Sequence, residues 1–250
     1  MIILACETST LLGSVAIIKD GHILCKKELL RQGSHSEMLN TFIADCLAST
    51  SLQLCDIDVF VTGLGPGSFT GLRISLNTIK TLAYVNQKPV WGCDSLLNLA
   101  FENKKYFKNE NILKSKKLTS MINAYKNMVY IAEYEILNLS DSNTIDKTEI
   151  IEIKPPQVVR VQELDTFITE NTWTFGDGFE VFQKYFSENL KSKCLRLQTS
   201  NDHPTAESLG LIASLAENQP QYYSWEKLVP IYLRASEAEE VKAGIKYQAL

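Results

Sequence analysis

The sequence predicts an α/β protein built from two related lobes. Short apolar runs of strand length alternate along the chain with amphipathic stretches of helix length. The order of these segments in the first half returns in the second half, where two strand-like runs again flank a turn and a later run again enters a glycine-containing turn. The 250 residues suit one large domain or two of roughly 100–150 residues each.

Three strands are expected at the start of the chain. Ile2–Cys6 is an almost continuous apolar run, which is typical of a strand buried on both faces. Ser14–Lys19 and Ile23–Leu29 follow as the second and third strands. Asp20-Gly21 joins them, and both residue types tolerate positive φ in a tight hairpin turn. These segments predict an antiparallel meander.

Helices and short buried strands complete the predicted first lobe. A helix is expected from Ser34 or Ser36 to about Ser49, because its apolar residues recur on one stripe and Ser34 with Glu37 has the form of a capping box. A glycine-dense turn follows at Gly63–Gly71, between a strand and a helix. The remaining elements are a strand at Val59–Thr62, a helix at about Thr70–Asn86, a strand at Pro89–Trp91 and a helix from Asp94 or Ser95 to Phe101.

A lysine-rich stretch marks the predicted boundary between the lobes. Residues 102–117 hold six lysines among few apolar residues, which indicates a solvated linker or a basic loop that faces RNA. The second lobe is expected to contain strands at Leu118–Asn123, Met128–Ile136 and Trp173–Phe175, the turn Gly176-Asp177-Gly178, and helices at Phe179–Glu188 and Thr205–Glu217. The predicted domains are 1–101, 102–204 and a tail of 220–250, with a helix at about 205–219 packing back on the first lobe.

Composition and charge exclude several classes of protein. The net charge is −4, from 25 basic and 29 acidic residues, which disfavours a domain that grips nucleic acid by itself. No apolar run reaches membrane-spanning length, and the apolar start lacks a preceding basic region, so we expect a cytoplasmic protein without a signal peptide or membrane span. The six cysteines are scattered singly and the three histidines form no paired motif, which predicts free buried thiols and no metal site.

The segment GPGSFTG carries the most chemical information. Its glycines permit close approach of the backbone, and its hydroxyl side chains can cap the following helix, so exposed N–H groups and the helix dipole can form an anion cradle. It is neither a Walker A loop, since no Lys-Ser/Thr follows, nor G-x-G-x-x-G. Phosphate binding and a tight structural turn are both open at this stage. The residues that would hold phosphate are Gly65, Gly67, Ser68, Thr70 and Gly71.

Six motifs together resemble the TsaB (YeaZ) family, partner subunits of the machinery that makes threonylcarbamoyl-adenosine in tRNA. GPGSFTGLR and the YLR tail in combination are highly specific for it. The motifs are ETST-x-x-GSVAI from Glu7, HSE at His35–Glu37, GLGPGSFTGLR at Gly63–Arg73, GDG at Gly176–Gly178, PTAESLG at Pro204–Gly210 and VPIYLRASEAEE at Val229–Glu240.

The resemblance implies the ASKHA fold, the two-lobed arrangement of actin, sugar kinases and Hsp70. It implies a subunit without catalysis, metal or cofactor of its own, with ADP or ATP at the partner interface left open. Its partner TsaD carries the metal and nucleotide site and modifies adenosine 37 of tRNA, and the small ATPase TsaE joins the assembly. The chain would contact tRNA indirectly through the complex and form a homodimer when TsaD is absent.

Two positions depart from the family pattern. Glu7 stands where active ASKHA proteins have an aspartate that helps hold the metal through water, which fits a site that is not under catalytic demand. Asn123-Ala124-Tyr125-Lys126 replaces D-A-R-R at the second-lobe hairpin. A role that relatives give to the aspartate and the arginines is therefore not assigned to this chain. Glu7, Ser9 and Thr10 could still line a remnant nucleotide cleft.

The resemblance also suggests that the first two long helices form the surface that meets TsaD or a second copy of the chain. The alternative is an ordinary solvated face. Small and mixed polar side chains suit an exchangeable contact better than an obligate one. The expected interface residues are Ser36, Glu37, Asn40, Thr70, Arg73, Ile74, Asn77, Lys80 and Thr81.

Other functions compete with this interpretation. His35 and Glu37 could be an acid/base pair, but they point to different faces of a helix, which favours a role at the helix start. The cluster Tyr222-Tyr223-x-Trp225 suits either stacking on RNA bases or packing of a C-terminal segment. The alternative functions are a nucleotide-binding regulator and a glycoprotease-like or ATPase enzyme of the same fold, and no serine–histidine–aspartate arrangement supports the enzyme.

Overall fold

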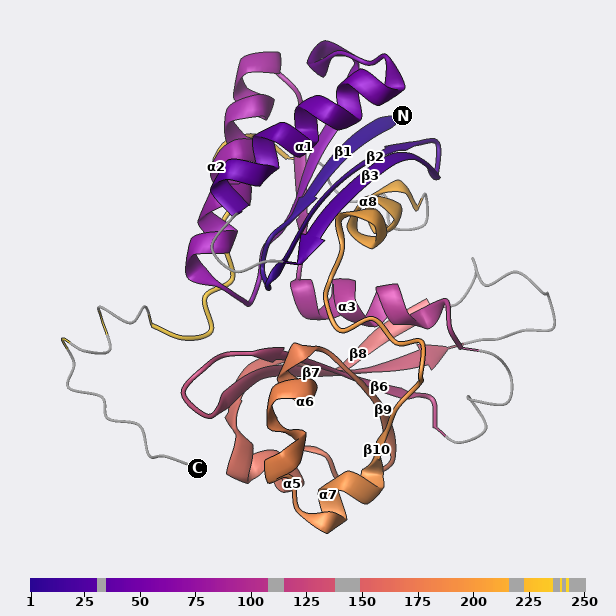
Figure 1. Cartoon of the computed structure of the whole chain (residues 1–250), viewed down its shortest axis with the longest axis vertical. Helices are drawn as coiled ribbons and strands as arrows, with labels where there is room; N and C mark the ends of the chain where they lie inside the picture. The colour runs from indigo at the N-terminus through magenta and orange to yellow at the C-terminus, as the bar shows by residue number, and fades with distance from the viewer. Residues whose placement is uncertain are drawn as a thin grey trace. The chain divides into compact units, whose positions relative to one another are not determined.

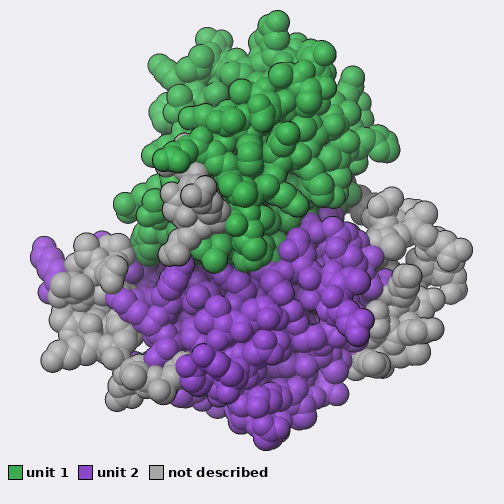
Figure 2. Space-filling model, viewed as in Figure 1, with its two compact units in different colours: residues 1–98, 203–231 green, residues 99–202, 232–250 purple. Residues whose placement is uncertain are grey.

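The computed structural model describes residues 1–30, 35–107, 115–137, 149–215, 223–235, 239 and 242. The chain divides into two units (Figure 2). Unit 1 comprises Met1–Asn98 and His203–Ile231, and unit 2 comprises Leu99–Asp202 and Tyr232–Leu250. Each unit contains one five-stranded sheet of mixed strand direction.

The elements follow the chain as numbered in Figure 1. Those of unit 1 are β1 (Ile2–Glu7), β2 (Leu12–Lys19), β3 (His22–Leu30), α1 (His35–Thr50), η1 (Leu54–Asp56), β4 (Val59–Gly63), α2 (Phe69–Asn86), β5 (Val90–Cys93), α8 (Ala206–Ser214) and η6 (Trp225–Lys227). The helix α3 (Ser95–Lys104) begins in unit 1 and ends in unit 2. Those of unit 2 are β6 (Lys117–Asn123), β7 (Met128–Leu137), β8 (Glu149–Arg160), η3 (Val161–Glu163), α5 (Leu164–Phe167), β9 (Thr172–Phe175), α6 (Asp177–Phe182), η4 (Gln183–Tyr185), α7 (Glu188–Lys193) and β10 (Cys194–Leu195).

The two sheets have the same topology. Their strand orders are β3-β2-β1-β4-β5 and β8-β7-β6-β9-β10, with an antiparallel meander followed by two parallel strands in each. The predicted hairpin turn is present, with φ of 49° at Asp20 and 79° at Gly21. This duplication confirms the prediction of an α/β protein built from two lobes, each with a meander and helices.

Helices cover both faces of the unit 1 sheet (Figure 1). α1 and α2 pack on the face that contains Leu4, Cys6 and Phe60. α8 packs on the opposite face, where a Cβ added at Gly210 would lie 2.1 Å from the Cδ1 of Ile18. Because alternate residues of β1 are buried on opposite faces, this strand needs an unbroken apolar run.

The sequence predicts the second lobe less accurately than the first. The helix predicted at Phe179–Glu188 is wrong in extent, because Phe179, Phe182 and Phe186 all turn into the core and the chain breaks into α6, η4 and α7. Ser187 caps the new helix by accepting a hydrogen bond from the Leu190 N–H at 3.0 Å. The sequence does not predict β8, since Pro155-Pro156 interrupts its pattern. An edge strand tolerates prolines, and the pairing with β7 shifts register there.

The unit boundaries differ from the predicted domains. Unit 1 ends at Asn98 rather than at residue 101. Within unit 2, the side chain of Asn103 pairs with the backbone of Asn201 at 2.8 Å. Residues 223–231, predicted as tail, belong to unit 1. Tyr223 forms a β-bridge with Val90, and the Ile231 N–H donates to the Leu64 carbonyl at 2.8 Å.

Candidate functional site

The glycine turn after β4 starts the longest helix of unit 1. Ser68 is the N-cap of α2, and its hydroxyl accepts from the Gly71 N–H at 3.2 Å. The Ser68 N–H donates to the Ser9 carbonyl at 2.7 Å, and the Leu72 N–H donates to the Ser68 carbonyl at 2.9 Å. Two N–H groups of the predicted anion cradle, those of Ser68 and Gly71, are therefore engaged within the chain.

Two glycines of this turn allow backbone to meet backbone. A Cβ added at Gly67 would lie 2.2 Å from the Ser9 carbonyl oxygen, and one at Gly71 would lie 2.0 Å from that of Thr8. The Thr8 hydroxyl in turn donates to the Gly71 carbonyl at 2.8 Å. Because glycine has no Cβ, the turn can pack directly against the backbone of residues 8 and 9.

The Glu7 carboxylate lies fully buried at the end of β1. Its Oε1 accepts from the N–H groups of Thr8 at 2.9 Å and Ser9 at 2.8 Å. Its Oε2 accepts from the Ser95 hydroxyl and the Asn98 amide, each at 3.2 Å. Four donors satisfy this carboxylate inside unit 1.

Asn98 extends this polar centre to α8. Its amide also donates to the Thr205 carbonyl at 3.0 Å, and the Ser208 hydroxyl donates to its oxygen. Ser9 and Thr10 are buried, and Thr10 contacts His203 Nδ1 at 3.1 Å. The residues expected to line a remnant cleft are therefore packed inside the unit.

One face of α2 carries the residues predicted for partner binding. Thr70, Arg73, Asn77 and Thr81 are exposed, while Ile74 and Lys80 are half-buried. The opposite stripe is buried, as its 3.6-residue periodicity predicts, and consists of Leu72, Leu76, Ile79 and Ala83. The guanidinium of Arg73 lies 5.8 Å from the centre of the Phe69 ring.

α1 places further predicted residues beside this face. α1 and α2 lie side by side on the same face of the sheet and contact each other (Figure 1). Glu37 and Asn40 are exposed on α1. Ser36 lies in the helix, but its side chain, like Ser34 with its capping box, is outside the described residues. We call these residues together the helical face: Glu37 and Asn40 on α1, and Thr70, Arg73, Ile74, Asn77, Lys80 and Thr81 on α2.

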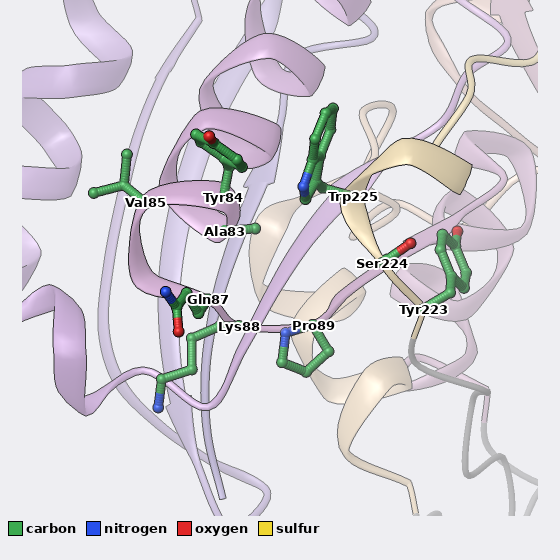
Figure 3. Close-up of a pocket in the computed structure, with 9 residues that line it drawn as sticks. All are labelled: Ala83, Tyr84, Val85, Gln87, Lys88, Pro89, Tyr223, Ser224 and Trp225. Carbon is green, nitrogen blue, oxygen red and sulfur yellow. The ribbon is translucent and has the colours of Figure 1, made fainter.

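A pocket of about 670 Å³ lies at the C-terminal end of α2 (Figure 3). Tyr84 packs edge-on against Trp225, with ring centres 5.4 Å apart, and the Lys80 ammonium lies 5.9 Å from the Trp225 ring. Tyr84 and Val85 are 63% and 69% exposed. Neither residue was among those predicted from the sequence for the interface, although Tyr84 continues the helical spacing of three or four residues that relates Asn77, Lys80 and Thr81. Trp225 packs on α2, and Tyr222 is outside the described residues.

Much of the lysine-rich stretch is used in structure. Lys104 is buried with its ammonium 4.2 Å from the Phe101 ring centre, and Lys105 pairs with Glu102. Lys117 pairs with Glu170 at 2.9 Å and with Glu133, and hydrogen bonding to Glu170 is the main cause of its raised pKa. Lys108 and Lys114 lie outside the described residues. Three of the six lysines thus already have structural contacts.

A second carboxylate centre lies in unit 2. Asp177 accepts from the Asn123 N–H at 2.9 Å, at the end of β6. Burial is the main cause that raises its pKa to about 6, opposed by backbone hydrogen bonds. The charge of Asp202 also raises this pKa, and Asp202 in turn accepts a hydrogen bond from Arg196 at 2.7 Å.

The described residues contain neither a cluster of metal ligands nor a membrane-spanning helix. Within them, no three His, Cys, Asp or Glu side chains converge as a metal site would require. No helix among them is long and apolar enough to cross a membrane.

The comparisons with known proteins agree on one family. The family model described as "TsaD: tRNA N6-adenosine threonylcarbamoyltransferase" matches residues 30–242. The chain is 30% identical to the tRNA threonylcarbamoyladenosine biosynthesis protein TsaB of Escherichia coli K12, over 94% of this chain and 95% of that protein. It is 27% identical to TsaB of Haemophilus influenzae, over 93% of each. The fold is similar to that of YeaZ from Pseudomonas aeruginosa, with a TM-score of 0.72, 23% identity and coverage of 93% of this chain and 99% of that one.

Proposed function

The chain belongs to the TsaB (YeaZ) branch of the TsaD family, and from this premise we propose that it is the non-catalytic subunit that binds and activates TsaD. It serves the biosynthesis of threonylcarbamoyladenosine in tRNA. In this proposal TsaE joins the assembly, and tRNA is held chiefly by the catalytic partner, because this chain is net acidic.

The observation that carries the proposal is the helical face. It combines exposed polar residues with the half-buried Ile74 and ends at the exposed Tyr84 and Val85. A mostly polar face with one arginine, a half-buried isoleucine and an adjoining exposed tyrosine and valine suits a specific but exchangeable protein contact. The same face would pair two copies of this chain when TsaD is absent.

The Glu7 centre supports a subunit without its own catalysis. A carboxylate that holds a metal through water needs lone pairs directed at that water, whereas Glu7 directs its oxygens at four donors of the chain. An ATPase or glycoprotease of the same fold would need this position open. The engaged N–H groups of Ser68, Gly71 and Leu72 likewise favour the structural use of the glycine turn, so any ADP or ATP would depend on the partner.

The proposal is tested by reconstitution. TsaD, TsaE, tRNA, ATP and threonylcarbamoyl-adenylate are combined with and without this chain, and modified adenosine is counted by mass spectrometry. We expect product only when the chain is present. Product that is indifferent to the chain, together with failure of the chain and TsaD to associate, would refute the proposal. ATP hydrolysis or peptide cleavage by the chain alone, abolished by a point mutation, would favour the enzyme instead.

A further inference from the structure

Two cysteines that lie far apart in the sequence meet in unit 1. Cys25 is on β3 and Cys46 is on α1, and their sulfur atoms are 3.0 Å apart. Both are free thiols. A disulfide bond is about 2.05 Å long, so the two sulfurs need to approach by only about 1 Å to bond.

The surroundings give the two thiols different roles. Cys25 is half-buried on an edge strand, whereas Cys46 is buried beneath it. The Ser49 hydroxyl donates to the Cys25 sulfur at 3.2 Å. Burial raises the pKa of the Cys46 thiol, while Lys27 opposes this shift and Asp45 adds to it. Cys25 is therefore the thiol that a reagent in solution reaches first.

We propose that Cys25 and Cys46 are a modification site at which a small-molecule disulfide, such as oxidised glutathione, drives formation of a reversible intramolecular disulfide. The Cys25 thiolate attacks one sulfur of oxidised glutathione and releases one glutathione thiolate. Cys46 then loses its proton to solvent, and its sulfur attacks that of Cys25 and releases the second glutathione thiolate. Two protein thiols are oxidised as one glutathione disulfide is reduced to two thiols.

The bond would join α1 to the edge of the sheet. α1 carries Glu37 and Asn40 of the helical face, so its attachment to β3 limits how far that face can move. Disulfides in reducing compartments are usually transient and redox-sensing, which fits a pair that is free in one state and poised to close. This inference stands on the geometry of unit 1 and holds whatever partner the helical face binds.

The test uses the full-length chain, purified with its thiols reduced and then incubated with oxidised glutathione under native conditions. After free thiols are blocked, the protein is digested and analysed by mass spectrometry without reduction. We expect a Cys25–Cys46 cross-link at least about tenfold faster than any pair that includes the exposed Cys55, because contact raises the effective concentration. Dithiothreitol should reverse it, and hydrogen exchange of residues 37–50 should slow only while the bond is present.

Variants separate the steps of this reaction. Cys46→Ser should trap a glutathione adduct on Cys25, and Cys55→Ser is the matched control that leaves the Cys25–Cys46 cross-link unchanged. A cross-link that forms only in urea, or equal pairing of Cys25 with Cys55, would overturn the site. A cross-link that leaves the exchange of α1 unchanged would overturn the attachment of the helix.

Discussion

The two units share one topology but support the end of their first strand in different ways. In unit 1, Glu7 on β1 turns back to accept the N–H groups of Thr8 and Ser9, fully buried among four donors. In unit 2, the carboxylate that accepts the Asn123 N–H comes from Asp177 at the start of α6, is half-buried and has a raised pKa. In both units a carboxylate thus accepts backbone N–H groups at the end of the first strand. Glu7 has four donors in unit 1, whereas burial disfavours the charged form of Asp177 in unit 2.

The connections that follow the fourth strand differ as well. α2 of unit 1 has 18 residues and an exposed face, whereas α6 of unit 2 has 6 residues and is followed by a break. The long helix buries one stripe and leaves a second stripe exposed, while the aromatic residues of the short helices pack in the core. The same strand topology is therefore followed by a long helix with an exposed face in one unit and by short helices packed into the core in the other.

The largest expected effect tests the glycine contacts of the two units. Gly71→Ala places a Cβ 2.0 Å from the Thr8 carbonyl oxygen, where backbone on both sides resists movement. We expect a loss of about 4 kcal/mol in the free energy of unfolding, measured by urea titration. The matched change Gly178→Ala meets its nearest atoms at 3.1 Å and should cost about 1 kcal/mol. Equal costs would remove this difference between the units.

The Glu7 centre gives the next effect. Glu7→Ala leaves two buried N–H groups and the donors of Ser95 and Asn98 without their acceptor, and we expect it to cost about 3 kcal/mol. Glu7→Gln keeps the volume and one acceptor oxygen and should cost about 1 kcal/mol. Thermal unfolding checks both, and an alanine variant as stable as the parent would show that the carboxylate is not structural.

Asp177 predicts a dependence on pH that is confined to unit 2. Its pKa is about 6 in the folded chain and near 3.8 when unperturbed, so the folded state binds the proton more tightly and loses stability as pH rises from about 4 to 6. Asp177→Asn should therefore raise the free energy of unfolding by about 2 kcal/mol at pH 7.5 and by little at pH 4. Asp165→Asn is the control, because hydrogen bonding to Ser187 lowers the pKa of Asp165 and its replacement should not stabilise. A gain that is independent of pH would contradict this account.

The smallest effect concerns the helical face. Arg73→Glu should weaken binding to TsaD about tenfold, measured by titration calorimetry, while the chain stays folded. Lys184→Glu is the matched control in unit 2, since Lys184 also lies over a neighbouring ring, that of Tyr185, at 4.9 Å. Equal affinity of both variants for TsaD would place the interface elsewhere.

Local patterns were enough to predict most of unit 1. Asp20-Gly21, the apolar run of β1 and the helix expected at about Thr70–Asn86 each depend on neighbours in the sequence, and all three predictions are confirmed. Unit 2 follows its patterns less closely. The edge strand β8 was not predicted, because Pro155-Pro156 interrupts its sequence pattern. The helix expected at Phe179–Glu188 is broken, because burial of the Phe182 and Phe186 side chains outweighs helix propensity.

By itself the sequence determined the fold class, the family and the helix that carries the helical face, because these follow from periodicity and from motifs of adjacent residues. Only the tertiary structure decided the partners of Glu7, which include Asn98, and the meeting of Cys25 with Cys46. The tertiary structure also decided the pocket between α2 and Trp225. Contacts of this kind join residues whose separation along the chain carries no pattern, since they depend on how packed elements bring distant side chains together.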